Sequence, residues 1–241
     1  MLEKTQGLYV IDVLGDPNVS FQAFFQQLLK EMELEPSCQF VKGIHESEDL
    51  LLIPSCEPIG VIISGSIHSV YEKTSWIVKL EKLVQMLYEK DIPTFGICFG
   101  HQIIGSALGG KVEKLPHIRE YGKFPVFLTP EASHPFLEGF TSGMMTIQTH
   151  QDHVSQLPPG ATQLGFSYIT ENQIFSMGSC FGVQFHPEYN EDMLKYLGNL
   201  RKNIYMREKL YNSEKHLELF LKTLENGVKP KSTSYVILKN F

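Results

Sequence analysis

The sequence predicts a single three-layer α/β domain, in which helices flank a mostly parallel central sheet with a mixed or antiparallel extension. Two observations carry this prediction. Over roughly the first hundred residues, short apolar runs alternate with segments of helical periodicity, which is typical of parallel βαβ units. Beyond Gly110 the apolar segments are short and separated by turn residues, which favours antiparallel strands. A chain of 241 residues can bury one large core of this kind.

The expected elements follow from these patterns. Apolar residues recur at helical spacing in Val19–Glu33 and Trp76–Tyr88, and a charged helical pattern covers Glu191–Glu225. The charged face from Arg201 to Glu225 is expected to be solvated, with a contact to an acceptor domain or a second copy as the alternative. Strands are predicted at Leu8–Leu14, Cys38–Val41, Ile59–Ser64, Ile92–Ile97, Phe124–Leu128, Met144–Thr149, Ala161–Ser167 and Phe181–Phe185.

The chain offers no linker long or polar enough to separate two domains. We therefore expect one domain over residues 1–241, with a core at about 8–192, a helical extension at 191–226 and a tail at 229–241. The tail is expected to begin as a loop and to end in the apolar stretch SYVILKNF.

Composition narrows the classes of function. The net charge of -6 disfavours a nucleic-acid or anionic-membrane partner, since both reward clustered Lys and Arg. No apolar run approaches the roughly 20 residues that cross a bilayer, and the N-terminal stretch lacks the features of a secretory signal. The four cysteines show no CxxC spacing. A cytoplasmic protein with reduced thiols is the expectation.

Cys98 is the first candidate catalytic residue. It lies in GICFG, between an apolar strand and a helical segment, with Gly96 and Gly100 two residues to either side. This spacing predicts a sharp strand-to-helix turn that exposes the nucleophile over the sheet. The helix N-terminus beyond it favours a thiolate. A buried, inert cysteine is the alternative.

A cysteine nucleophile needs a base and a group that orients the base. The stretch GVQFHPE brings His186 to the end of an apolar strand and places Glu188 two positions later. The carboxylate can then hold one imidazole nitrogen while the other faces the thiol. Alone this spacing is weak evidence, but together with the cysteine turn it predicts a Cys-His-Glu triad.

These motifs resemble those of the class I glutamine amidotransferases, which carry GxCxGxQ and HPE. Two further stretches are similar to the family in the same order, IISGSIHSVYE (62–72) and THQDHVSQLPPG (149–160). The resemblance covers roughly Leu8–Asp192 and implies a flavodoxin-like class I amidotransferase fold. It is closer to stand-alone members of the γ-glutamyl peptidase kind than to GMP synthetase.

The resemblance implies a γ-glutamyl thioester on Cys98 and a tetrahedral oxyanion held by two backbone amides, those of Phe99 and Ser66. Many members carry glycine at the Ser66 position, so serine is acceptable here unless that residue needs a positive φ. Gly65 is expected to let the neighbouring peptide orient.

For the substrate's amino and carboxylate end, the resemblance implies Gln102, which lies one helical turn after the nucleophile. Gln151 and Asp152 are expected to add main-chain contacts, and Glu120 to approach the same pocket. No cofactor and no metal is predicted. His150 and His153 lack the compact ligand set that a metal needs.

Three functions stay open. The first is a cysteine-dependent hydrolase of glutamine or γ-glutamyl amides and peptides that releases ammonia or an amine. The second is a glutaminase subunit that delivers ammonia to a separate synthase. The third is a non-catalytic regulatory module of the same fold. The expected partner is a small γ-glutamyl molecule, and a synthase partner or a homo-oligomer remains open.

Overall fold

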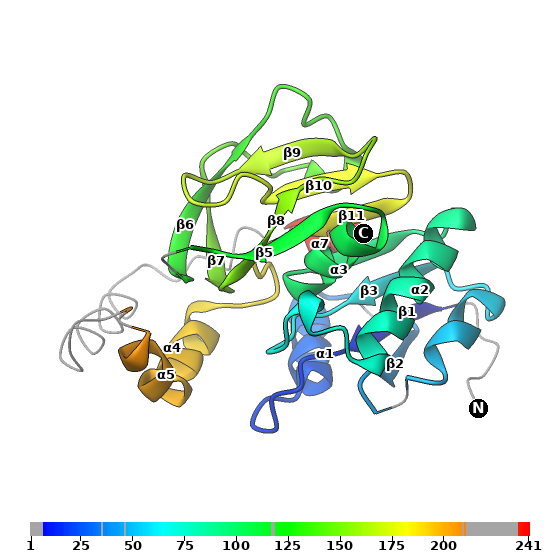
Figure 1. Cartoon of the computed structure of the whole chain (residues 1–241), viewed down its shortest axis with the longest axis horizontal. Coiled ribbons are helices and arrows are strands. Elements are labelled where there is room, and N and C mark those ends of the chain that lie inside the picture. Colours follow the sequence, from blue (N-terminus) through cyan, green and yellow to red (C-terminus); the bar gives the residue numbers. More distant parts are fainter. Residues whose placement is uncertain (1–6, 35, 46, 117–118, 209, 211–235) are drawn as a thin grey trace.

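A computed structural model describes residues 7–34, 36–45, 47–116, 119–208, 210 and 236–241. Within these residues one nine-stranded sheet runs through the molecule in the order β2-β1-β3-β4-β11-β10-β9-β6-β7 (Figure 1). The first five are parallel: β2 (Cys38–Lys42), β1 (Leu8–Asp12), β3 (Gly60–Ile63), β4 (Thr94–Ile97) and β11 (Cys180–Val183). The last four are antiparallel: β10 (Ile174–Met177), β9 (Thr162–Phe166), β6 (Glu120–Leu128) and β7 (Met144–His150).

Helices cover both faces of the parallel part. On one face, α2 (Ser75–Glu89), α3 (Phe99–Ala107) and the 3-10 turn η1 (Leu50–Ser55) pack on one set of strand side chains, including Tyr9 and Ile11. On the other face, α1 (Phe21–Glu31) and α7 (Val236–Asn240) pack on the alternate set, including Val10. Successive strand residues point to opposite faces, which gives each face its own core.

The predicted three-layer α/β architecture is confirmed. Three strands escaped prediction: β10, and the two-stranded ribbon of β5 (Lys111–Lys114) and β8 (Asp152–Gln156). β5 is four residues long and almost wholly exposed, so it carries no apolar run that a pattern could detect. The domain boundaries remain predictions.

The C-terminal segments differ in part from expectation. The charged pattern becomes two short helices, α4 (Glu191–Leu200) and α5 (Lys202–Arg207), and residues 211–235 of the predicted extension and tail lie outside the described residues. The apolar end forms α7, a helix that was not predicted. Ile237 is buried there, and the ring of Phe241 lies 5.6 Å from that of Phe95. The end of the chain is therefore part of the core.

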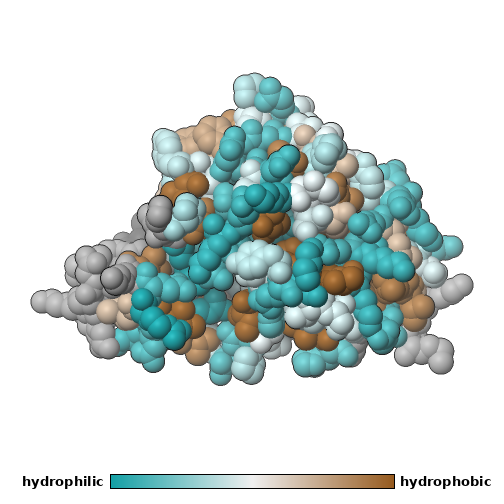
Figure 2. Space-filling view, in the orientation of Figure 1, coloured by the Kyte–Doolittle hydropathy of each residue, from teal (hydrophilic) through white to brown (hydrophobic). Residues whose placement is uncertain are grey.

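The outer surface is as polar as expected for a chain with 20% charged residues. One face of the molecule is mostly hydrophilic, with scattered hydrophobic residues between the polar ones (Figure 2). Among the described helices, none combines the length and the apolar character that a bilayer span requires.

Two glycines allow α3 to sit directly on the strands. A Cβ on Gly100 would lie 2.2 Å from the carbonyl oxygen of Ile63 in β3. A Cβ on Gly96, in β4, would lie 2.4 Å from the carbonyl of Gly100. These neighbours are backbone atoms and cannot turn aside, so the predicted GxCxG spacing has a steric cause.

Gly100→Ala is expected to lower the free energy of unfolding by about 3 kcal/mol or more, because the added methyl forces α3 off β3. Ser106→Ala is the matched control in the same helix. Its side chain is partly exposed, so its cost should stay below about 1 kcal/mol. Urea unfolding followed by circular dichroism measures both, and equal costs would contradict the steric explanation.

Candidate active site

The candidate site lies where three neighbouring parallel strands end. β3, β4 and β11 are adjacent, and their carboxyl ends lead into Ser64–Ser66, Cys98 and His186 respectively. In open α/β sheets this edge is where ligands bind. Stretches of sequence that are far apart in the chain are thereby brought to one place.

Cys98 occupies a strained turn. Its backbone has φ 52° and ψ -99°, and it is the residue immediately before α3. Its N–H donates to the carbonyl oxygen of Val183 at 2.8 Å, which anchors the turn to β11. Positive φ is costly for a residue with a side chain and tends to occur at functional sites. The geometry is that of the predicted strand-to-helix turn.

His186 and Glu188 form a buried pair. The Nδ1 of His186 lies 2.7 Å from Oε1 of Glu188, and both side chains are at most 4% exposed. Burial by itself would lower the pKa of His186, but the charges of Glu188 and Cys98 and hydrogen bonds to both raise it to about 10. Since Nδ1 faces Glu188, Nε2 is the nitrogen left for Cys98. The predicted triad is assembled in space.

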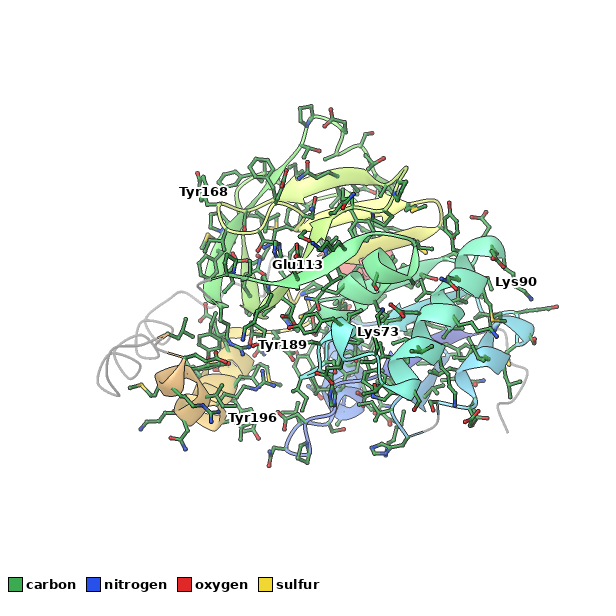
Figure 3. The ribbon with its side chains drawn as sticks, viewed as in Figure 1. Lys73, Lys90, Glu113, Tyr168, Tyr189 and Tyr196 are labelled. Carbon is green, nitrogen blue, oxygen red and sulfur yellow. The ribbon has the colours of Figure 1, made fainter. Side chains whose placement is uncertain are left out.

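Two further residues hold the histidine, and one was missed in the sequence. The ring of Tyr189 stacks on His186 with centroids 4.2 Å apart and planes 4° apart. Tyr189 lies between the sheet and α4 (Figure 3). On another side, a Cβ on Gly65 would lie 3.0 Å from Cε1 of His186, so a side chain there would press on the ring. Tyr189 follows HPE directly, yet its contact depends on how the chain folds back.

The loop after β3 is braced from β1. Ser64 Oγ accepts a hydrogen bond from Val13 N–H at 2.9 Å, and Ile67 N–H donates to Leu14 O at 3.0 Å. Ser66 has no positive φ, so its serine side chain is compatible with the backbone there. Phe99 is the first residue of α3, where a helix N–H has no partner within the helix. Of the two predicted oxyanion amides, that of Phe99 is next to Cys98 in the chain, and Ser66 lines the same cavity as Cys98.

A cavity of about 120 Å³ opens beside the nucleophile. Five of the nine predicted site residues line it, namely Cys98, Ser66, Gln102, Gln151 and Asp152. The other four, His186, Glu188, Phe99 and Gly65, are not part of its lining. The wall opposite comes from the loop after β5 and from α4–α5, through residues that the sequence did not point to. These are Arg119, Arg201, Ile204 and Tyr205.

The expectation of a solvated charged face is wrong for Arg201. Its side chain is 15% exposed, pairs with Asp16 at 3.2 Å and lines the cavity. Nearby, Arg119 pairs with Glu208 at 2.9 Å and lies 5.7 Å from the ring centroid of Tyr205. The charge pattern predicted that these side chains face solvent. In the structure their contacts hold α4–α5 against the site. No local signal marked Arg201 as different from its charged neighbours.

The residues expected to hold the substrate are built into the cavity wall. Gln102 Nε2 donates to the main-chain oxygen of Asp152 at 2.8 Å. Gln151 Oε1 accepts from Arg119 Nη2 at 2.8 Å. The Asp152 carboxylate accepts from Ser69 Oγ and, at 3.0 Å, from Tyr71 Oη, both beyond the Ser66 loop. Asp152 therefore ties the two sides of the cavity together.

Other histidines have different surroundings. His101 is fully buried against Phe175, and burial lowers its pKa to about 3, so it is a neutral core residue. Glu120 does not line the cavity. It lies fully buried behind His150, with its Oε2 2.8 Å from the Nε2 of that histidine. Among the described residues no group of three or more potential ligands has the arrangement of a metal site.

The raised pKa of His186 can be measured directly. We expect the imidazole to stay charged at about pH 8.5, whereas an ordinary histidine would be neutral. Glu188→Gln removes the negative partner, so the titration should move to lower pH. NMR titration of the ring, assigned by its loss in His186→Asn, reads this out. Glu113→Gln, on an exposed strand (Figure 3), is the control; a wild-type midpoint near 6.5 would contradict the pairing.

Comparisons with known proteins identify the family of the chain. The model of the family "Glutamine amidotransferase class-I" matches residues 18–195. The chain is 37% identical to gamma-glutamyl peptidase 4 of Arabidopsis thaliana over 139 residues, which cover 56% of this chain and 55% of that protein. It is 31% identical to gamma-glutamyl peptidase 5 of the same plant, over 76% of this chain and 72% of that protein.

Two more distant similarities add context. The chain is 34% identical to a glutamine-hydrolysing GMP synthase of Wolinella succinogenes, over 76% of this chain but only 35% of that protein. The structure of a glutamine amidotransferase from Thermotoga maritima superposes with a TM-score of 0.75 at 23% identity, covering 97% of this chain and 94% of that one. This last likeness supports the flavodoxin-like amidotransferase fold. With the family match over most of its length, the chain belongs to the class I glutamine amidotransferases.

Proposed function

We propose that this chain is a cysteine-dependent hydrolase that cleaves the γ-amide of glutamine or of γ-glutamyl amides and peptides through a γ-glutamyl thioester. The observation that carries the proposal is the buried His186–Glu188 pair set against Cys98 on its strained turn. A binding module would need none of this arrangement. The names of the peptidase and GMP synthase relatives support the substrate class.

In the first half-reaction the Cys98 sulfur attacks the γ-carbonyl carbon, and the electron pair of the C=O bond moves onto oxygen. The amides of Ser66 and Phe99 stabilise that oxyanion. The intermediate collapses as the C–N bond breaks, and His186 passes its proton to the departing nitrogen. A histidine with a pKa near 10 is charged at neutral pH and so has this proton available.

In the second half-reaction, neutral His186 takes a proton from water as the water oxygen attacks the thioester carbon. The same two amides stabilise the second oxyanion. Collapse breaks the C–S bond, and its electron pair returns to sulfur while the imidazolium keeps the proton. Glu188 holds the ring orientation throughout and stabilises its charged form.

The substrate's amino and carboxylate end is assigned to the wall that contains Gln102, Gln151 and Asp152, next to Gly65. The carbonyl oxygen of Gln151 already accepts from Leu115 N–H at 2.8 Å. We assign to the substrate the other polar groups of Gln151 and the side-chain oxygen of Gln102, whose Nε2 already donates two hydrogen bonds.

The second candidate is a glutaminase subunit that feeds ammonia to a separate synthase. Similarity to one third of a GMP synthase favours it. The position of α4–α5 favours the self-sufficient hydrolase, because residues of this chain itself close the cavity. We assign no nucleic-acid or membrane partner, and leave a homo-oligomer open. Four free cysteines support a cytoplasmic location.

A panel of glutamine, γ-glutamyl alkylamides and γ-glutamyl dipeptides tests the proposal. We expect wild-type protein to release ammonia or amine, and Cys98→Ala to lose at least about 10³-fold in kcat because no thioester can form. Cys56→Ala is the control, since Cys56 is another buried free thiol, bonded only to the Leu52 carbonyl. It should keep its activity.

The comparison across the panel also separates the candidates. Efficient turnover of γ-glutamyl peptides by the isolated chain supports the hydrolase. Slow turnover of glutamine alone, stimulated by a synthase co-purified from the source cell, would favour the ammonia-delivering subunit. Equal turnover by wild-type and Cys98→Ala protein would overturn both.

A further inference from the structure

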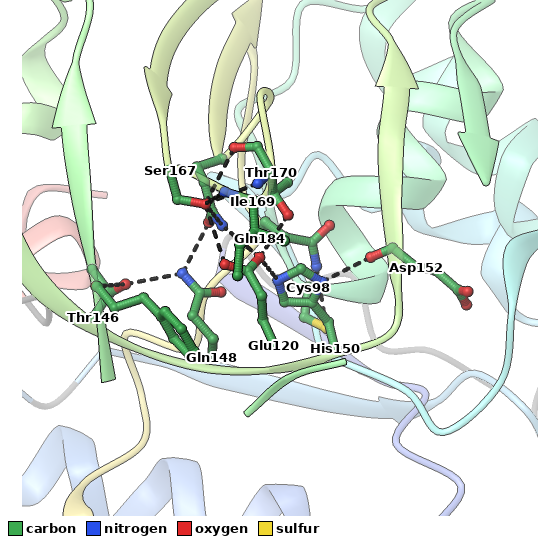
Figure 4. A network of polar contacts seen from close by, with 12 residues as sticks. Cys98, Glu120, Thr146, Gln148, His150, Asp152, Ser167, Ile169, Thr170 and Gln184 are labelled. Carbon is green, nitrogen blue, oxygen red and sulfur yellow. Dashed lines mark hydrogen bonds and ion pairs between the residues drawn. The ribbon is translucent and has the colours of Figure 1, made fainter. Parts of the chain in front are cut away.

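A buried chain of hydrogen bonds runs from the nucleophile to a carboxylate on the far side of the cavity wall (Figure 4). Its first member is Gln184, a fully buried residue just after β11. The Nε2 of Gln184 lies 3.6 Å from Sγ of Cys98, and its Oε1 accepts from Gln102 Nε2 at 3.1 Å. Neither the triad nor the oxyanion amides account for this contact with the reacting sulfur.

The far end of the chain is an ion pair. Burial would raise the pKa of Glu120, but hydrogen bonds and charge from His150, together with Thr170, hold it below its ordinary value. Glu120 is therefore ionised and only accepts hydrogen bonds. The Nε2 of His150 faces this carboxylate at 2.8 Å, while Nδ1 lies 2.9 Å from the main-chain oxygen of Asp152. Both ring nitrogens of His150 therefore face acceptor oxygens.

The main-chain oxygen of Asp152, which also lies next to His150 Nδ1, sets the direction of the bonds that follow. The Asp152 oxygen can only accept, so Gln102 must turn its NH₂ group toward it, at 2.8 Å. The second hydrogen of that NH₂ goes to Gln184 Oε1. Gln184 must then present its own NH₂ to the sulfur of Cys98. The amide orientations follow from the network, because the reverse arrangement would set donors against donors.

We propose that Gln184 is a further catalytic residue, whose side-chain N–H donates to Cys98 Sγ and stabilises the thiolate. Gln102, His150 and Glu120 are positioning residues that act through it. The proposal rests on the function proposed above, in that Cys98 is the nucleophile. Negative charge sits on sulfur before attack and again when the C–S bond of the thioester breaks, so the donor serves both steps.

The position of the donor fits this role. His186 also hydrogen-bonds to the sulfur of Cys98, but it must release its proton during the proposed reaction. The amide of Gln184 keeps its protons at every stage, so it can hold the charge while the imidazole is neutral. Gln184 is fully buried, and the sulfur of Cys98 is the partner of its side-chain nitrogen. Without that partner, burying the amide nitrogen would cost free energy of folding.

The reactivity of the sulfur toward iodoacetamide tests the inference without any substrate. We expect Gln184→Leu to slow carboxamidomethylation of Cys98 at neutral pH by about tenfold, the size of one lost hydrogen bond to a charged group. Intact-protein mass spectrometry follows the rate. Thermal unfolding monitors the fold of each variant.

Gln148→Leu is the matched control. Gln148, in β7, is also a fully buried amide, and its Nε2 donates to Thr146 Oγ1 and Gln173 Oε1 at 3.0 Å each. It is linked to Glu120 through Gln173, but it takes no part in the bonds that join Gln102, Gln184 and Cys98. Its labelling rate should stay within about twofold of wild type. A Gln184→Leu rate within the same range overturns the proposal.

Gln102→Leu and Glu120→Gln keep the test decisive if Gln184→Leu does not fold. A residue that only grips substrate would leave labelling unchanged and raise KM. If Gln102 orients Gln184, its loss slows labelling as well, and Glu120→Gln slows it by a smaller factor. Unchanged labelling in both variants overturns the chain of positioning.

The outcome is separable from that of the proposed function. Slow labelling of Gln184→Leu in a protein that cleaves no γ-glutamyl substrate would leave the sulfur contact standing and remove the proposed function. Normal labelling of Gln184→Leu in a protein that does cleave the panel would remove the contact and leave the function.

Discussion

The direct contact of α3 with β3 and β4 is the constraint on which the rest of the site depends. It exists because Gly96 and Gly100 carry no Cβ, so the helix starts within touching distance of the strand carbonyls. With α3 in that place, the chain must reverse within one residue, and Cys98 takes a positive φ. The sulfur is thereby lifted over the sheet edge while the first helical amide lies free beside it.

The other residues of the site are positioned by segments outside the turn at Cys98. Strand β11 runs beside β4 in parallel, so its end brings His186 and Glu188 to the same edge. The loop after β1 braces the loop that carries Ser66. A pairing of Arg201 with Asp16 closes the site from the C-terminal side. Each support comes from a different part of the chain.

Two kinds of buried charge surround the nucleophile. The His186–Glu188 pair touches it directly and exchanges protons in the proposed reaction. The His150–Glu120 pair stands further back, and His150 Nδ1 contacts the Asp152 oxygen that orients the neutral amides leading to the sulfur. Such buried pairs are costly unless every partner is satisfied. Ser167 and Thr170 supply additional hydroxyl donors to Glu120, which offsets part of that cost.

Much of the fold and the centre of the site were predictable from sequence. Alternating apolar runs predicted eight strands that the structure contains, because burial on both faces leaves a continuous hydrophobic signal. The exposed β5 lacked that signal, and in β8 and β10 only two residues of each strand are buried. The triad was predictable because its chemistry demands particular residue types at particular spacings. Tyr189 and Gln184 lie within three residues of His186, yet nothing local distinguishes a stacked ring or a sulfur-facing amide from ordinary core side chains.

The sequence by itself determined the layer architecture and the position of the turn at Cys98, and it singled out His186 and Glu188 as the proposed base and orienting acid. These follow from periodicity, glycine sterics and reaction chemistry, all of which act over a few residues. Only the tertiary structure decided that Arg201 lines the cavity and that Glu120 and Cys98 are joined by one chain of polar contacts. Glu120 lies 22 positions and Arg201 lies 103 positions after Cys98 in the chain. Such separations do not indicate contacts until the order of the strands in the sheet is known.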